Sequence, residues 1–260
     1  MRLNFKYIRY FFPLYLFGLA SLDAQIVAVS ANAQYVVNDL IQQFAKETGA
    51  HITSVIGSSG TLTAQIKNGA PFDLFLSADT AYPGVLWRDG YAVDSPRVYG
   101  FGTLVMWTSN GRDLSLGMES LRGAKVKTIA IANPQNAPYG AAAVEALEKS
   151  LLWETVKSKI VYGESISQVN QYVDIRAVDV GFTSASVVLS EQLKGKGTWK
   201  EVERSLYSPI PQAAILLNSE LMDSVGSGLV DKKKIAKQFY DFLFSVKAKE
   251  IFQRFGYSVP

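Results

Sequence analysis

The chain of 260 residues contains no cysteine and a single histidine, His51. The lack of cysteine excludes a disulfide framework, a thiolate metal site and a lipid anchor on an N-terminal cysteine. One histidine without cysteine also gives too few ligands for a cation site of the zinc type. The fold must therefore be held by a hydrophobic core, and a chain of this length with 48% apolar residues can form one.

The sequence also lacks a strong excess of charge. Its formal net charge is +3, but Arg2, Lys6 and Arg9 lie at the start of the chain, with Asp23 as the first acid. These four residues carry a net +2, so the remainder of the chain is near +1. This balance gives no reason to expect a nucleic-acid partner.

No apolar run is long enough to cross a membrane. The uncharged run from Tyr10 to Leu22 has thirteen residues, whereas a span needs about 20. With the basic residues before it and small residues that allow cleavage after Ala20 or Ala24, residues 1–24 are predicted to be a secretory signal peptide. A transmembrane anchor is the alternative. Export without disulfides points to a bacterial periplasm.

The chain contains a recurring strand–turn–helix unit. In one copy the apolar strand 52–56 runs into Gly57-Ser58-Ser59-Gly60, and an amphipathic helix with Leu62 and Ile66 follows and ends at Gly69. The first amides of a helix lack partners, and the helix dipole is positive at that end. Such a turn therefore suits an anion.

Three further turns fit the same pattern: Ala31-Asn32 between strand 26–30 and helix 34–48, Pro138-Tyr139, and Ser165-Ile166. Capping of the following helix is a competing role for Asn32. None of the four turns contains Lys, Arg or His, so they would hold a dianion by neutral dipoles. Sulfate, molybdate and tungstate suit such a donor-only site, whereas the O–H of a protonated phosphate needs an acceptor.

Alternating strands and helices predict an α/β protein with parallel sheets. Crossings marked by Gly100, within the strand-like run 98–108, and by Pro211 predict two lobes. The first would comprise residues 25–103 with 211–260 and the second residues 104–210, with a ligand cleft between them. Further predicted strands are 72–76, 128–132, 159–162, 178–183 and 212–217. Further predicted helices are 118–121, 141–150, 153–158 and 166–173, one that follows the N-cap Asp79 and runs toward Asp89, and one that follows Ser184-Ala185-Ser186 and ends at Gln192. The C-terminus is also predicted to be helical. The remaining expectations are a polar loop at 194–198 and a solvated basic run at 232–234.

Several segments resemble the periplasmic molybdate-binding proteins of ABC transporters. They are Ile26-Val-Ala-Val-Ser-Ala-Asn32, Gly57-Ser-Ser-Gly-Thr-Leu62, Gly69-Ala-Pro-Phe-Asp-Leu-Phe-Leu-Ser-Ala-Asp79, Asn133-Pro134 with Ala137-Pro138-Tyr139-Gly140, and Ile251-Phe-Gln-Arg-Phe-Gly256. The resemblance covers nearly all of the chain after residue 24. It implies a two-lobed type II periplasmic-binding fold with hinge strands that cross twice. It also implies a non-enzymatic monomer without a cofactor, which delivers molybdate or tungstate to an inner-membrane permease.

The resemblance also implies which residues bind the oxyanion. They are Asn32 with the amide beside it, Ser59, the amides of Tyr139 and Ile166, and, as a neighbour, Ser58. The sequence departs from the family pattern at two positions. Ala31 stands where some members have a hydroxyl residue, so a contact there would come from its backbone. Ser184 stands where some members have a tyrosine that reaches the oxyanion.

Two alternatives stay open. The same fold could bind sulfate or another oxyanion, because cavity size decides between them. A secreted serine hydrolase with Ser58 or Ser59 as nucleophile is the alternative from a different class. It would need a base, and His51 is the one candidate histidine; no Gly-x-Ser-x-Gly elbow surrounds either serine.

Overall fold

The computed structural model describes residues 25–218 and 229–260. The predicted signal peptide, residues 1–24, lies outside them, and so do the side chains of Lys232 and Lys233 in the predicted basic run. Within the described residues, no helix has both the length and the apolar character needed to cross a membrane.

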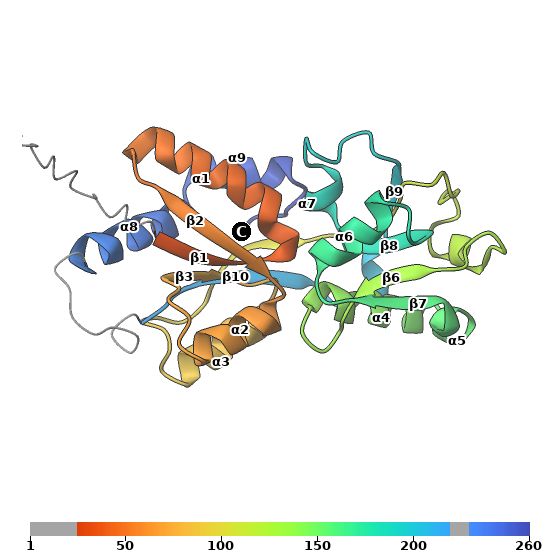
Figure 1. Cartoon of the computed structure of the whole chain (residues 1–260), viewed down its shortest axis with the longest axis horizontal. Coiled ribbons are helices and arrows are strands. Elements are labelled where there is room, and N and C mark those ends of the chain that lie inside the picture. The colour runs from red at the N-terminus through yellow and green to blue at the C-terminus, as the bar shows by residue number, and fades with distance from the viewer. Residues whose placement is uncertain (1–24, 219–228) are drawn as a thin grey trace, which may run out of the picture.

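Two five-stranded sheets lie side by side and form the centre of the structure (Figure 1). The first has the order β2-β1-β3-β10-β4, with β1 (Gln25–Ser30), β2 (Ile52–Gly57), β3 (Leu74–Leu76), β4 (Arg97–Gly102) and β10 (Ile210–Leu216). The second has the order β7-β6-β8-β5-β9, with β5 (Leu104–Thr108), β6 (Ile129–Ala132), β7 (Ile160–Gly163), β8 (Val180–Ser184) and β9 (Thr198–Glu201).

Helices cover both sheets. The first sheet carries α1 (Gln34–Thr48), α2 (Ser59–Lys67), α3 (Ala81–Arg88), α8 (Leu229–Phe242) and α9 (Val246–Arg254). The second carries α4 (Pro138–Lys149), α5 (Trp153–Val156), α6 (Ile166–Asp174) and α7 (Ala185–Val188). Short 3-10 helices are η1 (Ala31–Ala33), η2 (Gly117–Arg122), η3 (Lys157–Lys159) and η4 (Arg204–Leu206). We call the first sheet with its helices the first lobe and the second sheet with its helices the second lobe.

The prediction of parallel sheets is correct for part of each sheet and wrong for the rest. β1 is parallel to β2 and β3, and β6 is parallel to β7 and β8. β10 instead runs antiparallel to β3 and β4, and β5 runs antiparallel to β8 and β9. β5 and β10 enter their sheets from the other lobe and not through a helical crossover, which is the connection that parallel neighbours require.

The chain crosses from the first sheet to the second within the predicted strand-like run 98–108. β4 ends at Gly102 and β5 begins at Leu104, so the run is divided between the two sheets at Thr103. The return crossing lies in β10, which contains Pro211. β9 begins at Thr198, where a loop was predicted, and its four residues are all exposed. Because β9 buries no apolar face, its sequence carries no strand signal.

The first sheet is packed between two groups of helices. In Figure 1, α1, α8 and α9 lie on one side of it and α2 and α3 on the other. α1 turns Val36, Val37, Leu40 and Phe44 inward and ends at Gly49, whose φ of 73° is left-handed. The ring of Phe44 lies 5.2 Å from that of Phe239 in α8, which ties the two helices together. The core thus holds α1 and α2 against opposite faces of the sheet.

Candidate functional site

Each of the four predicted turns begins a helix. Ser58 is the N-cap of α2, because its Oγ accepts the N–H of Thr61 at 3.2 Å. Ile166 is the first residue of α6. α4 begins at Pro138, earlier than the predicted residue 141, since proline suits the first position of a helix. Proline has no N–H, so Tyr139 supplies the first amide of α4.

The four turns converge on one cavity of about 10 Å³. Its lining residues are Ser30, Ala31, Asn32, Ser58, Ser59, Ala78, Ala137, Pro138, Tyr139 and Ile166. Residues 30–78 belong to the first lobe and residues 137–166 to the second, so the cavity lies between the lobes. All the predicted binding residues except Ser184 are in this lining. A volume this small admits about one water-sized sphere, which means that the two lobes are in close contact here.

The cavity lining contains no charged side chain. The N-terminal residues of α2, α4 and α6 lie in its wall, and each helix brings unpaired amides and a positive dipole end to it. Such an arrangement favours an anion without a cation beside it. A fully ionised oxyanion would find donors from both lobes.

Ser59 has the side chain best placed to donate into the cavity. Its Oγ accepts the N–H of Ala78 at 3.0 Å, and among the described residues no acceptor is hydrogen-bonded to its O–H. The hydroxyl of Ser58 differs, because it donates to Thr61 Oγ1 at 2.7 Å. Of the two adjacent serines, Ser59 therefore keeps its proton for another partner.

The side-chain amide of Asn32 has no N–H left to donate into the cavity. Its Nδ2 donates to Gln212 Oε1 at 2.8 Å and to Tyr257 Oη at 3.2 Å, so both of its N–H groups are used. The competing role as an N-cap is wrong, since α1 begins at Gln34 and its N-cap is Ala33, which makes no side-chain cap. In this arrangement Asn32 can contribute its backbone amide to the cavity.

Ser184 lies behind Asn32 and is absent from the cavity lining. Its Oγ donates to the carbonyl of Asn32 at 3.3 Å and lies 2.8 Å from Ser186 Oγ, which also donates to that carbonyl. The two serines therefore hold the Asn32 backbone from the second lobe.

A buried polar network that the sequence analysis missed joins these turns to the crossing strand β10. Gln212 on β10 accepts from Asn32 and, at 2.9 Å, from Tyr99, and its Nε2 donates to Tyr139 Oη at 2.9 Å. Burial raises the pKa of Tyr99 and of Tyr139 well above their usual value and raises that of Tyr257 to about 12, so all three phenols are neutral. The one sequence signal near Gln212 was the crossing marked by Pro211.

The backbone at Gly102 passes close to this network. A Cβ on Gly102 would lie 1.9 Å from Tyr139 Oη and 2.3 Å from Gln212 Nε2. The crossing strand therefore needs glycine where it passes the two side chains. Three further lining residues, Ser30, Ala78 and Ala137, were also missed; Ser30 ends β1, Ala78 follows β3, and Ala137 precedes α4.

Comparison with known proteins gives the family. Residues 26–258 match the family of bacterial extracellular solute-binding proteins. The chain is 37% identical to the molybdate-binding protein ModA of Rhodobacter capsulatus over 92% of this chain and 89% of that protein. The chain belongs to the family of bacterial extracellular solute-binding proteins. As a member of it, the chain is a non-enzymatic solute-binding protein, and the prediction of a non-enzyme is confirmed.

Solved structures of similar proteins agree with the architecture. The Azotobacter vinelandii periplasmic molybdate-binding protein superposes with a TM-score of 0.82 at 32% identity, covering 91% of this chain and 99% of that one. The predicted two-lobed α/β fold class is thereby confirmed. The sulfate-binding protein SubI of Mycobacterium tuberculosis, at 13% identity and a TM-score of 0.68, shares the fold.

The cavity lacks the parts of a hydrolase. His51 is exposed just before β2 and is absent from the lining, so neither Ser58 nor Ser59 has a histidine base. In the described part of the chain, no cluster of three or more His, Cys, Asp or Glu side chains could hold a metal ion. Both observations fit a solute-binding protein that uses neutral donors.

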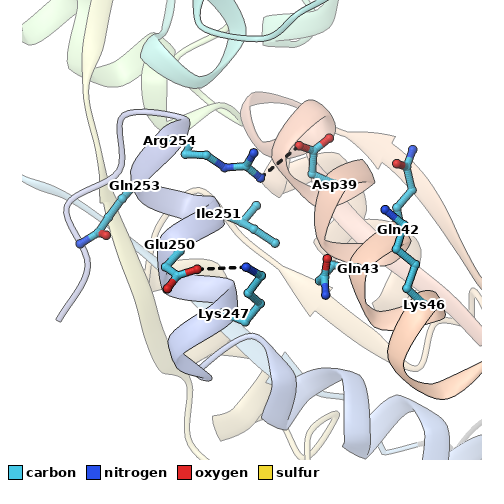
Figure 2. A pocket seen from close by; sticks show the side chains of 9 residues that line it. All are labelled: Asp39, Gln42, Gln43, Lys46, Lys247, Glu250, Ile251, Gln253 and Arg254. Atoms are coloured by element: carbon cyan, nitrogen blue, oxygen red, sulfur yellow. Dashed lines mark hydrogen bonds and ion pairs between the residues drawn. The ribbon is translucent and has the colours of Figure 1, made fainter.

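A larger hollow of about 780 Å³ lies elsewhere, between α1 and α9 (Figure 2). Long polar side chains form its walls, and Arg254 lies 3.6 Å from Asp39 while Lys247 lies 3.2 Å from Glu250. The lining has three bases and two acids, and both acids lie beside bases, which weakens the attraction of the groove for an anion. None of its lining residues belongs to the interlobe cavity.

Proposed function

We propose that this chain captures molybdate, and also tungstate, in the cavity between its lobes and delivers the oxyanion to an ABC permease in the inner membrane. The observation that carries the proposal is the convergence of three helix N-termini and the Ser59 hydroxyl on one cavity whose lining has no charged side chain. The relatives that are named molybdate-binding proteins support the choice of ligand.

The proposed donors come from both lobes. The first lobe offers the backbone at residues 31 and 32 and the hydroxyl of Ser59, and the second offers the amides of Tyr139 and Ile166. A tetrahedral dianion can accept several such hydrogen bonds at once, and together they offset its desolvation. Sulfate carries the same charge on a smaller frame, so discrimination against it depends on how closely the donors approach.

Binding from two sides couples the ligand to lobe closure. We propose that residues 25–103 with 211–260 and residues 104–210 move as two bodies about β4–β5 and β10. A ligand that contacts both bodies favours the closed arrangement over the open one by the difference between those contacts. The protein would act as a periplasmic monomer after removal of residues 1–24.

Thermal unfolding of residues 25–260 tests the proposal. At a hundredfold excess over Kd, a ligand that binds the folded state adds about 2.7 kcal/mol of stability, which raises the melting temperature of a chain of this size by roughly 5–10 °C. Molybdate and tungstate should each produce such a rise, and sulfate and phosphate should not. No rise with molybdate, or an equal rise with sulfate, would contradict the proposal.

A further inference from the structure

Two of the hydrogen bonds that join the lobes lie between the α2–α3 side of the first lobe and the loop before α4. The N–H of Gly60, in the first turn of α2, donates to the carbonyl of Asn136 at 2.9 Å. The Oη of Tyr82, in α3, donates to the carbonyl of Gln135 at 3.0 Å. Both donors belong to the first lobe, and both acceptors belong to the loop between β6 and α4 of the second. Gly60 follows Ser59 and Asn136 precedes Ala137, and Ser59 and Ala137 line the cavity.

Gly60 allows this approach because it has no side chain. A Cβ there would lie 2.7 Å from Asn136 Cβ, 2.9 Å from Asn136 Cα and 2.8 Å from Tyr82 Oη, all closer than real Cβ contacts. The φ of Gly60 is not among the positive values of the described glycines, so its backbone conformation does not require glycine. Alanine would also be the better helix former at this position. The contact with Asn136 therefore explains the glycine.

The facing loop is fixed within its own lobe. The carbonyl of Asn133 accepts the N–H groups of Asn136 at 3.2 Å and of Ala137 at 2.9 Å, and Asn133 Oδ1 accepts the N–H of Gln135 at 3.0 Å. Moving this loop would break these bonds and shift the start of α4. A side chain at residue 60 would therefore be accommodated more readily by separation of the lobes.

We propose that Gly60, Tyr82 and the carbonyls of Gln135 and Asn136 form an interlobe latch that slows release of the bound oxyanion. This inference rests on the proposed function and extends it to the rate of release. The latch bonds cross from one lobe to the other, so they are made when the lobes close and exchanged for water when they open. Gly60 sets how closely the donors of α2 and α4 can surround the ligand.

Gly60→Ala tests the latch, with Gly84→Ala as the matched control. Gly84 also lies in a helix, α3, but a Cβ there would meet its nearest neighbour, Arg88 Nη1, at an ordinary 3.5 Å. Both changes favour the helix, so neither should lower the melting temperature of the ligand-free protein. In stopped-flow chase experiments, Gly60→Ala should release molybdate about tenfold faster or more, which corresponds to the loss of a hydrogen bond or slightly more. Gly84→Ala should release it at the wild-type rate.

Tyr82→Phe isolates the second bond of the latch. Because it removes one hydroxyl at an exposed position, release should accelerate by about two- to tenfold, with no change in the ligand-free melting temperature. Wild-type release rates in both Gly60→Ala and Tyr82→Phe would overturn the proposal.

The distance between the lobes provides a second readout, which is independent of the release rate. The chain has no cysteine, so spin labels can be placed at Asn68→Cys in the first lobe and Glu148→Cys in the second, both exposed. With molybdate, wild type and Gly84→Ala should show the short closed distance, and Gly60→Ala should keep a longer one. If molybdate binds to none of the proteins, the proposed function fails. The latch is then tested separately, by comparing the label distances of the three proteins without ligand. A loss of the closed population in Gly60→Ala alone would support the latch, and equal distributions in all three proteins would overturn it.

Discussion

The hydroxyl oxygen of Ser59 accepts the backbone N–H of Ala78 at 3.0 Å, and this bond joins the start of α2 to the segment after β3. The bond fixes the direction of the hydroxyl, because the oxygen lone pair faces Ala78 and the proton is left for another acceptor. Ser59 and Ala78 both line the interlobe cavity. The acceptor for that proton is therefore expected to be the oxyanion.

Ser59→Ala should weaken molybdate binding by about 1–3 kcal/mol, because it removes a hydrogen bond to a charged group. That loss is roughly a 5- to 150-fold increase in Kd, measured by isothermal titration. Unchanged affinity would place the ligand away from Ser59.

Ser58→Ala is the matched control one residue earlier. Its hydroxyl caps α2 through Thr61, so its loss should lower the free energy of unfolding by about 0.5–2 kcal/mol. The Kd for molybdate should change less than in Ser59→Ala. A larger binding defect in Ser58→Ala would reverse the roles given to the two serines.

Gln212→Leu should impair both stability and binding. Leucine leaves Asn32 Nδ2 and Tyr139 Oη without their buried partner, and each unpaired group costs about 1–3 kcal/mol. Because Asn32 and Tyr139 carry donor turns of opposite lobes, we expect weaker molybdate binding in addition to a lower melting temperature. Gln238→Leu, at an exposed position on α8, should change neither. An affinity equal to wild type in Gln212→Leu would show that the network supports the fold alone.

Acid stability should depend on Asp179, which joins three segments of the second lobe. Burial opposes its ionisation, but Arg112 Nη2 at 2.6 Å and the amides of Lys127 and Thr128 outweigh this and lower its pKa from 3.8 to about 2. A pKa that is lower in the folded state stabilises the protein above the unfolded value, and this contribution is lost as the pH falls from about 4 towards 2. Asp179→Asn should lower stability near neutral pH by on the order of 2 kcal/mol and flatten the decline in acid.

The control for Asp179 is Glu148→Gln, an exposed carboxylate on α4 of the same lobe. Denaturant melts from neutral pH to acid should give the wild-type profile for Glu148→Gln. A steep acid decline that persists in Asp179→Asn would assign the acid sensitivity to other groups.

Molybdate affinity should be nearly constant between about pH 6 and pH 9. Tyr139 is the one titratable side chain in the cavity lining, and burial raises its pKa well above the usual value. No residue of the lining therefore changes charge in this range. Isothermal titration at several pH values measures this, and a marked loss of affinity towards high pH would point to a lysine near the ligand instead.

The donor turns could be predicted because their signals are local. A strand, a small polar turn and an amphipathic helix are encoded in consecutive residues, which is why Ser59, Tyr139 and Ile166 were predicted to lie next to helix starts, although α4 begins three residues earlier than predicted. Local signals also placed most strands, since β6 is a continuous apolar run and β1 contains one from Ile26 to Val29.

Features that depend on tertiary contacts could not be predicted in this way. The side chain of Asn32 reaches Gln212 and Tyr257, which lie 180 and 225 residues further along the chain. Likewise, nothing near Gly60 in the sequence indicates that Asn136 will pack against it. β5 and β10 run antiparallel to their neighbours because the chain crosses between the lobes at these strands. The alternation of strands and helices along the sequence does not reveal such crossings.

The central claim is that a molybdate ion lies between the donor turns of the two lobes. An anomalous difference map from crystals of residues 25–260 grown with molybdate tests it most directly, because molybdenum is located without reference to any assumed site. We predict one strong peak within hydrogen-bonding range of the Ser59 hydroxyl and of the Tyr139 and Ile166 amides, with no lysine or arginine beside it. A peak elsewhere, such as in the groove between α1 and α9, or no peak at all, would contradict the account.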